Sequence, residues 1–453
     1  MREQIEAALR SSRADYTEIR LEERESTRIV FRGQDMETAN VVLDRGGIVR
    51  CLVRGGGWGI ATFNDPEDLP HRVGQAYEGA CAIQGEPIEL APIPVSEDVI
   101  TVPLERDFRG ISVTEKKDLA EEYNGILLRF DPRIVDTQTV YADTFSRVTF
   151  ANSEGTVIDE ERPMVNVAFS AVARENGNVQ RAFEAVSKVA GFEAVLGHQT
   201  LVETVAQRAV DLLAAPRVKG GRYTVVCNPR LAGVFAHEAF GHLSEADFVY
   251  ANPKAQEMMV LGRRFGQEIL TIVDDGSIPG LRGSHKYDDE GTPTGRAELI
   301  KNGVLVGRLH SRETAAKMGE RPTGNARATG YRYPPIVRMT NTFIEAGETS
   351  FEDVIRDIDL GVYACDAFGG QTALENFSFS AAYAYMIRDG QIAEMVRDVI
   401  LSGNLFVTLA HIDSVGDDFQ RAEWGMCGKG QGGLPVSMGA PHIRIRDVII
   451  GGE

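Results

Sequence analysis

Alternation of apolar and polar residues in the first half of the chain is the feature that most constrains its fold. Two alternating regions, 15–62 and 137–188, are broken by glycine-containing turns such as DRGG, GGGWG, NSEG and ENGN. A period of two places successive side chains on opposite faces of a strand, and short turns of this kind join antiparallel neighbours. The sequence therefore predicts two antiparallel meanders in this half.

Helical segments accompany both meanders. Residues 66–83 and 199–214 have the patterns expected of helices, whereas the proline-rich stretch 85–103 has little periodicity and is expected to be a connector. The segment 216–223 combines a proline, two glycines and three basic residues after the second helix, which indicates a domain boundary.

We therefore predict an α+β protein with two domains and mostly antiparallel sheets flanked by helices. The first is an N-terminal α+β domain, 1–215, built from two meander-plus-helix segments. The second, 220–453, is rich in glycine and short strand-like runs. Its first strand candidate is YTVVCN, and Asn228 followed by Pro229 is a typical helix start directly after that strand.

Charge and cysteine content exclude several classes of protein. The chain has 453 residues and a net charge of -18, from 48 basic and 66 acidic residues, which disfavours contact with nucleic acid or anionic membranes. No run approaches transmembrane length, and the N-terminus lacks the pattern of a signal peptide. Five scattered cysteines without a CxxC pair argue against a disulfide framework. We expect a cytoplasmic protein without direct nucleic-acid or membrane binding.

The motif HEAFGH, 237–242, lies on the helix that Asn228 begins. A residue advances about 100° around an α-helix, so histidines five positions apart differ by about 140° and cannot address one ion from a regular helix. A π-bulge, or unwinding at Gly241, would bring the two side chains together. Without such a distortion, His237 and His242 are two structural histidines on a buried helix.

A third ligand would be needed to hold a metal ion. Cys427 lies in MCGKGQGG, where glycines and a lysine replace the apolar neighbours of a core cysteine. The chain offers three other candidates, His411, Glu245 and Asp247. The remaining cysteines are expected to be inert core residues: Cys51, Cys81, Cys227 and Cys365.

Longer blocks carry a family resemblance. HEAFGHLSEAD resembles the signature helix of the TldD/PmbA family of zinc-dependent peptidases, and further similar blocks follow in family order: DDEGTPTGRAELIKNGVLVGRLHSRETAAKMG, PTGNARA, RMTNTFIEAG and CGKGQGGLPVSMGAP. The N-terminal segment 44–65 is similar as well, so the resemblance covers nearly the whole chain. HExxxH marks the catalytic TldD-type branch, because the PmbA/TldE-type branch lacks it.

The resemblance implies a metallopeptidase site in the C-terminal domain. His237, His242 and Cys427 would bind Zn²⁺, and Glu238 would be the catalytic base. Zinc accepts imidazole and thiolate ligands, and three protein ligands leave a fourth position open for catalysis. Expected substrates are unfolded or extended peptides and small proteins, in precursor processing or degradation. The expected partner is a PmbA/TldE-type subunit in a heterodimer, with a homodimer as the second choice.

Two other functions are compatible with the motif. A zinc-stabilised regulatory protein would bind a partner without hydrolysing it, and would need the metal ligands but not Glu238. Metal-dependent hydrolysis of a substrate other than a peptide is the third reading. A closed site with four protein ligands would favour the regulatory function.

Overall fold

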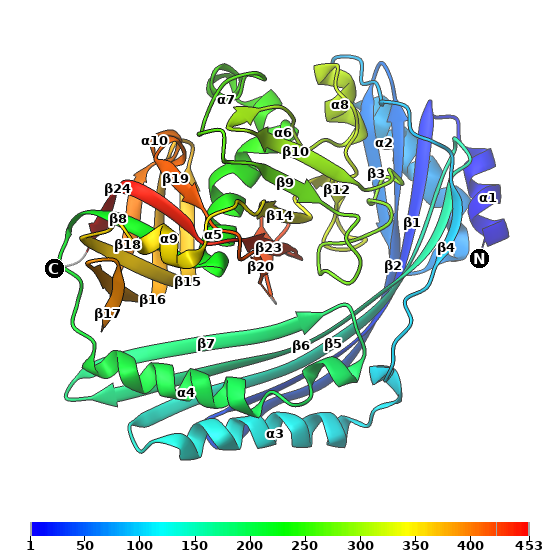
Figure 1. Cartoon of the computed structure of the whole chain (residues 1–453). Coiled ribbons are helices and arrows are strands. Elements are labelled where there is room, and N and C mark those ends of the chain that lie inside the picture. Colours follow the sequence, from blue (N-terminus) through cyan, green and yellow to red (C-terminus); the bar gives the residue numbers. More distant parts are fainter. Residues whose placement is uncertain (1, 423, 452–453) are drawn as a thin grey trace.

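A long, curved, mostly antiparallel sheet organises the N-terminal half (Figure 1). The computed structural model describes residues 2–422 and 424–451. The strand order is β3-β2-β1-β5-β6-β4, with β7 also paired to β6. The bounds are β1 (Tyr16–Arg32), β2 (Asp35–Val53), β3 (Gly57–Phe63), β4 (Glu97–Ile100), β5 (Ile134–Asn152), β6 (Val157–Glu175) and β7 (Asn178–Lys188).

The two predicted meanders form one sheet rather than two. They join where β1 pairs antiparallel with β5, from Glu18 opposite Asn152 to Arg32 opposite Gln138. The predicted connector also contributes a strand, because β4 pairs parallel with β6. The N-terminal half is therefore a single continuous layer.

Helices cover one face of this layer: α1 (Arg2–Ser11), α2 (Leu69–Ala82), α3 (Val113–Phe130) and α4 (Gln199–Ala214). Alternation along β1 explains their position. Ile19 and Leu21 belong to the core beneath α1 and α2, and Ile29 and Phe31 to the core beneath α3 and α4. Figure 1 shows α3 and α4 along the outer side of the curved sheet.

Three intervening residues of β1, Glu18, Arg20 and Glu22, are charged although buried, on the face toward the C-terminal half. Arg20 is 3% exposed and ion-pairs with Asp289 at 3.1 Å. On the same face, Arg162 of β6 reaches Asp289 at 3.0 Å and Arg50 of β2 reaches Glu290 at 3.4 Å. These pairs fix the C-terminal half on the polar face of the sheet.

The C-terminal half contains a sheet that closes on itself. Its order is β15-β8-β24-β18-β16-β17, with β19 on β24, and pairing of β15 with β16 closes the ring. The bounds are β8 (Gly221–Cys227), β15 (Leu360–Ala373), β16 (Asn376–Arg388), β17 (Gln391–Val396), β18 (Ile400–Asn404), β19 (Ile412–Val415) and β24 (Ile443–Gly451).

A second sheet, in the order β11-β10-β9-β14-β23-β20, lies beside the ring. Its strands are β9 (Ile272–Asp275), β10 (Arg296–Lys301), β11 (Val304–Leu305), β14 (Asn341–Ile344), β20 (Gln420–Arg421) and β23 (Ser437–Ala440). Two short pairs complete the strands: β12 (Ala326–Arg327) with β13 (Ile336–Val337), and β21 (Met426–Gly428) with β22 (Gly433–Pro435). The helices are α5 (Pro229–Ala236), α6 (Ala246–Ala251), α7 (Pro253–Met258), α8 (Arg312–Met318), α9 (Phe351–Ile355) and α10 (Leu405–Ala410).

The predicted α+β class is confirmed, with helices packed against largely antiparallel sheets. The helices predicted at 66–83 and 199–214 are present, as α2 and α4. One expectation is wrong: Cys81 is exposed near the end of α2, whereas Cys51, Cys227 and Cys365 are buried. Within the described part of the chain, no helix has the length and apolarity needed to cross a membrane.

The Asp289 pairs predict a pH-dependent contribution to stability. Burial alone would raise the pKa of this carboxyl, but Arg20 and Arg162 lower it below its ordinary value. A carboxyl with a depressed folded pKa stabilises the protein above its unfolded pKa, about 4, and loses that contribution as the pH falls further. Asp289→Asn should lower the free energy of unfolding at pH 7 by about 3–5 kcal/mol.

The measurement is the urea unfolding midpoint of both proteins between pH 7 and pH 3, where the difference should shrink below about pH 4. Glu394→Gln is the matched control, because Glu394 pairs with Arg388 on an exposed hairpin. Its change should stay within about 1 kcal/mol. An equal loss in both variants at pH 7 would contradict the assigned role of Asp289.

Candidate metal centre

The helix that carries HEAFGH is fixed at its start. The Asn228 side chain accepts a hydrogen bond from the backbone N–H of Leu231 at 2.9 Å, which caps α5. The same side chain donates to Asp366 at 2.9 Å and thereby ties the cap to β15. Gly233 allows close packing, since a Cβ there would lie 2.9 Å from the backbone nitrogen of Gly439 in β23. The position of α5 is thus set by both C-terminal sheets.

The turn after α5 resolves the five-residue spacing of the histidines. Residues His237–Gly241 form one π-helical turn, in which the N–H of His242 donates to the carbonyl of His237. The wider turn brings the rings of His237 and His242 to a centroid separation of 5.2 Å. Gly241 allows this path without displacing its neighbour, because a Cβ there would lie 2.0 Å from the sulfur of the buried Met339.

Three side chains converge at this turn. One donor atom each from His237, His242 and Cys427 lies within 4.8 Å of the others, and Sγ of Cys427 is 3.6 Å from Nε2 of His242. His237 is fully buried, yet among the described residues neither of its ring nitrogens has a hydrogen-bond partner. A buried imidazole without a partner is costly unless a metal ion uses it. Two imidazoles and a thiol are a donor set that zinc accepts.

Two acidic candidates for the third ligand lie behind His242. Glu245 accepts from Nδ1 of His242 at 3.0 Å, which leaves Nε2 directed toward Cys427. Lys429 contacts Glu245 at 3.1 Å and Asp247 at 2.8 Å. A carboxylate on the outer nitrogen fixes the ring orientation of a metal-binding histidine, and sequence reasoning missed this role for Glu245.

His411, the other candidate ligand, lies elsewhere. It directly precedes β19, and its Nδ1 is 3.2 Å from the backbone carbonyl of Arg446 in β24. Among the described residues, the cluster that brings potential ligand atoms together contains His237, His242 and Cys427.

The two histidines of the cluster differ in their pKa shifts, because burial and the charges of His242 and Arg338 lower the pKa of His237. Burial opposes protonation of His242, but its contacts with Cys427 and Glu245 raise its pKa to about 10. Burial raises the pKa of the Glu238 carboxyl, which His242 partly offsets and Glu245 increases. A carboxyl with a raised pKa is suited both to accept and to return a proton.

Cys427 is held by a short hairpin. It lies on β21 opposite Leu434 of β22. The buried guanidinium of Arg338 donates to the carbonyl of Cys427, and to those of Lys429 and Gly432 at 3.3 Å each. Arg338 thus fixes the hairpin through its backbone, another role that no local motif indicates.

Glu238 and His242 line one cavity of about 650 Å³. Glu238 is half-buried, and the opposite wall comes from the tip of the β15–β16 hairpin, including Gly370 and Gln371. Gly428 and Lys429 complete the wall next to Cys427. A ligand in this cavity would contact both the carboxyl of Glu238 and the imidazole of His242.

Comparison with known proteins identifies the same family along the whole chain. Residues 17–83, 106–213 and 220–452 match the models for domain 1, the central domain and the C-terminal domain of the PmbA/TldA metallopeptidases. The metalloprotease slr0863 of Synechocystis sp. is 47% identical over 444 residues, which is 98% of this chain and 96% of that protein.

More distant relatives cover most of the chain too. A zinc metalloprotease TldD homolog of Saccharolobus solfataricus is 29% identical over 78% of this chain and 81% of its own length. The crystal structure of TldE from Thermococcus kodakarensis superposes with a TM-score of 0.78 at 19% identity, covering 100% of both chains. The similarity to TldE is a similarity of fold.

The contact of Gly241 with Met339 predicts a selective loss. Gly241→Ala should displace the Met339 side chain or the π-helical turn, with a cost of about 1–3 kcal/mol and weaker retention of zinc. Gly74→Ala in α2 is the control, because a Cβ there meets nothing within 4 Å. Zinc per chain after dialysis and the unfolding midpoint measure the effect. Full zinc retention in Gly241→Ala would show that the turn tolerates a Cβ.

Proposed function

The chain belongs to the PmbA/TldD metallopeptidase family, and we propose that it is a zinc-dependent peptidase that cleaves unfolded or extended peptides and small proteins. One observation carries the proposal: two histidines and a cysteine converge beside a half-buried glutamate in a cavity. Such activity would serve precursor processing or degradation. Relatives named metalloproteases support the peptidase assignment.

In this proposal His237, His242 and Cys427 hold Zn²⁺. The partnerless ring nitrogens of His237 and the short separation of Cys427 from His242 support this ligand set. Glu245 would orient His242, and Arg338 would orient the hairpin of Cys427. Zinc, when bound, supplies Lewis acidity toward a carbonyl group and a water molecule.

Glu238 is the proposed catalytic base. It follows His237 directly in sequence, so its backbone is as firmly placed as that of the ligand. Its carboxyl would accept a proton from the attacking water and return it to the leaving peptide nitrogen. The raised pKa of Glu238 supports both steps, because the protonated form is stable enough to act as an acid.

Extended substrates suit the walls of the cavity. Gly370 and Gly428 line it without side chains that would shield the neighbouring backbone groups. A peptide in extended conformation forms hydrogen bonds mainly through its backbone, which gives affinity with little dependence on side chains. Unfolded peptides would therefore bind more readily than folded proteins.

A partner subunit is the second part of the proposal: a PmbA/TldE-type chain in a heterodimer, or else a second copy. The TldE likeness supports a related partner fold. Exposed apolar side chains on β2 support an interface, namely Met36, Val41, Val42 and Leu43, the last 78% exposed. β3 pairs only with residues 47–53 of β2, so this apolar stretch lies on an edge of the described sheet. Such edges are usually covered in proteins.

A cytoplasmic location also belongs to the proposal. All five cysteines are free, and Cys427 must remain a thiol to act as a ligand. A reducing compartment preserves both conditions. The net charge of -18 further supports a protein that does not contact nucleic acid.

Glu238→Ala tests the peptidase function. The variant should keep the zinc content of the wild type and lose cleavage of an unstructured peptide by about 100- to 10,000-fold, because the base is removed while the ligands remain. Zinc content is measured by mass spectrometry. Cleavage is measured both with and without a PmbA/TldE-type partner. If both proteins bind zinc and neither cleaves any peptide, the regulatory function replaces this proposal.

Cys427→Ser tests the third ligand. A hydroxyl is a much poorer zinc ligand than a thiolate, so this variant should lose most of its zinc on dialysis against a weak chelator. The matched control is Cys81→Ser, at an exposed site on α2, which should retain zinc fully. Equal zinc content in the two variants would remove Cys427 from the ligand set.

A further inference from the structure

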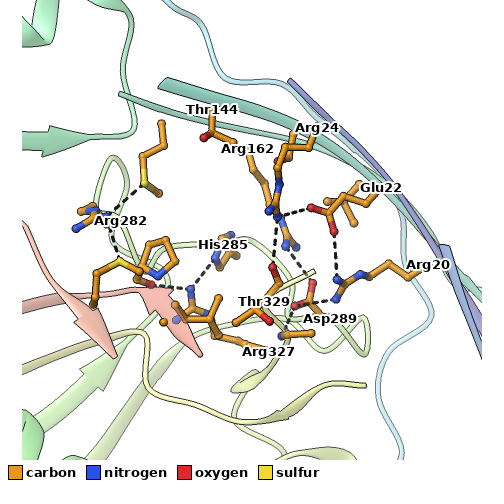
Figure 2. A pocket seen from close by; sticks show the side chains of 18 residues that line it. Arg20, Glu22, Arg24, Thr144, Arg162, Arg282, His285, Asp289, Arg327 and Thr329 are labelled. Atoms are coloured by element: carbon orange, nitrogen blue, oxygen red, sulfur yellow. Dashed lines mark hydrogen bonds and ion pairs between the residues drawn. The ribbon is translucent and has the colours of Figure 1, made fainter. Parts of the chain in front are cut away.

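An arginine-lined cavity of about 280 Å³ lies between the two halves of the chain (Figure 2). The sheet contributes Arg20, Arg24 and Arg162 to its wall, and the C-terminal half contributes Arg282 and Arg327. None of these residues lines the cavity of Glu238 and His242. A concentration of positive charge is unexpected in a chain with a net charge of -18.

The arginines from the sheet are already paired. Arg20 contacts Glu22 at 3.3 Å, and Arg24 contacts the same carboxylate. Arg162 contacts Glu160 at 2.7 Å. Asp289 is shared between Arg20 and Arg162. Three carboxylates thus compensate three arginines.

Neither Arg282 nor Arg327 forms a direct ion pair with a carboxylate within residues 2–422 and 424–451. Arg282 is only 8% exposed, and its guanidinium donates to the carbonyl of Gly425 at 2.8 Å. Its other contacts are the sulfur atoms of Met164 and Met426, each at 3.6 Å, and its Nε has no hydrogen-bond partner among the described residues (Figure 2). Burial lowers the pKa of Arg282 to about 10, which reflects the cost of a buried charge without a counter-ion.

Arg327 is the second arginine of this kind: burial lowers its pKa to about 10, although the charges of Asp289 and Asp274 partly offset that effect. It donates to the carbonyl of Pro435 at 2.9 Å and lies 3.2 Å from Nε2 of His285. Because an arginine only donates, that nitrogen of His285 accepts, and the ring is neutral. Burial lowers the pKa of His285, and the charges of Arg162 and Arg327 lower it further. The neutral imidazole therefore supplies no negative charge to Arg327.

We infer that this cavity binds a carboxylate of the peptide substrate. A carboxylate matches the planar fork of a guanidinium, and it would supply the direct ion pair that Arg282 and Arg327 lack. The volume suits a peptide end or a single acidic side chain rather than a folded partner. The inference rests on the proposed peptidase function, and it extends that function to a preferred substrate class.

The β21–β22 hairpin connects this cavity to the candidate metal centre. Met426 and Leu434 of the hairpin line the arginine cavity, whereas Gly428 and Lys429 line the cavity of Glu238. Cys427, between them, belongs to the metal cluster. Side chains alternate along a strand, so Met426 and Cys427 point to opposite faces. A carboxylate bound in the arginine cavity would thus lie on the other face of the hairpin that carries Cys427.

Three peptides test the assignment on the full-length, zinc-loaded protein. The first is an acetylated, unstructured hexapeptide with a free C-terminal carboxylate, the second is its amide, and the third is the amide with glutamate as last residue. The wild type should favour the first peptide, the third, or both over the second by about 10- to 100-fold in kcat/KM, mostly through KM. Preference for the first alone identifies the terminal carboxylate, and preference for the third identifies an acidic side chain.

Arg282→Met should abolish this preference, so that kcat/KM for the first and third peptides falls to the value for the neutral amide. The substitution leaves no carboxylate without a partner, and Arg388→Met on an exposed hairpin is the matched control. Unfolding midpoint and zinc content verify that both variants are folded. Equal cleavage of all three peptides by the wild type overturns the assignment even if Arg282→Met does not fold.

Binding measured without cleavage separates this inference from the peptidase proposal. Calorimetry of the three peptides with Glu238→Ala should show the same carboxylate dependence, and Glu238→Ala combined with Arg282→Met should lose it. If no protein cleaves any peptide but this dependence is observed, the peptidase proposal fails and the carboxylate site stands. Equal binding of all three peptides overturns the site whether or not cleavage occurs.

Discussion

Buried ion pairs between the polar face of the long sheet and the loop around Asp289 are the constraint on which the rest of the structure depends. Alternation along β1 gives one apolar face to the helices and leaves Arg20 and its neighbours on the other. Buried charges require partners, so the C-terminal half must supply acidic residues at matching positions. Asp289 and Glu290 do so. The two halves are therefore fixed relative to each other, and the arginine cavity exists only because both are present.

The candidate metal centre depends on a different kind of constraint, the local widening of a helix. One π-helical turn converts a spacing that separates His237 from His242 into one that brings their rings together. Gly241 limits the cost of that distortion, because it has no Cβ that would clash with the side chain of Met339. The third donor arrives on a hairpin whose backbone is held by Arg338. The fold thus holds the three donor atoms close together, and such positioning is a usual requirement for a catalytic site.

Sequence patterns predicted the local features and not the long-range ones. Alternation of apolar and polar residues predicted strands on both sides of residue 100. The Asn228–Pro229 pair predicted the start of α5. The need for a distorted turn followed from helix geometry alone. The joining of both meanders through β1 and β5 was not predicted, because a period gives the faces of a strand but not its partner. The orienting contact of Glu245 was missed for the same reason: a carboxylate near a histidine in sequence can be a ligand or its support, and only the fold distinguishes them.

The closed ring of the C-terminal half has a consequence for the order of events during synthesis. The strand that precedes α5, β8, pairs with β24, which ends the described chain at Gly451. Cys427 follows His242 by 185 residues. A chain still emerging from the ribosome therefore lacks the Cys427 thiol and the closing strand until residues 427–451 have been made. A product that stops before residue 427 would carry HEAFGH without the third side chain of the cluster, so the candidate metal centre forms only after most of the C-terminal half has been made.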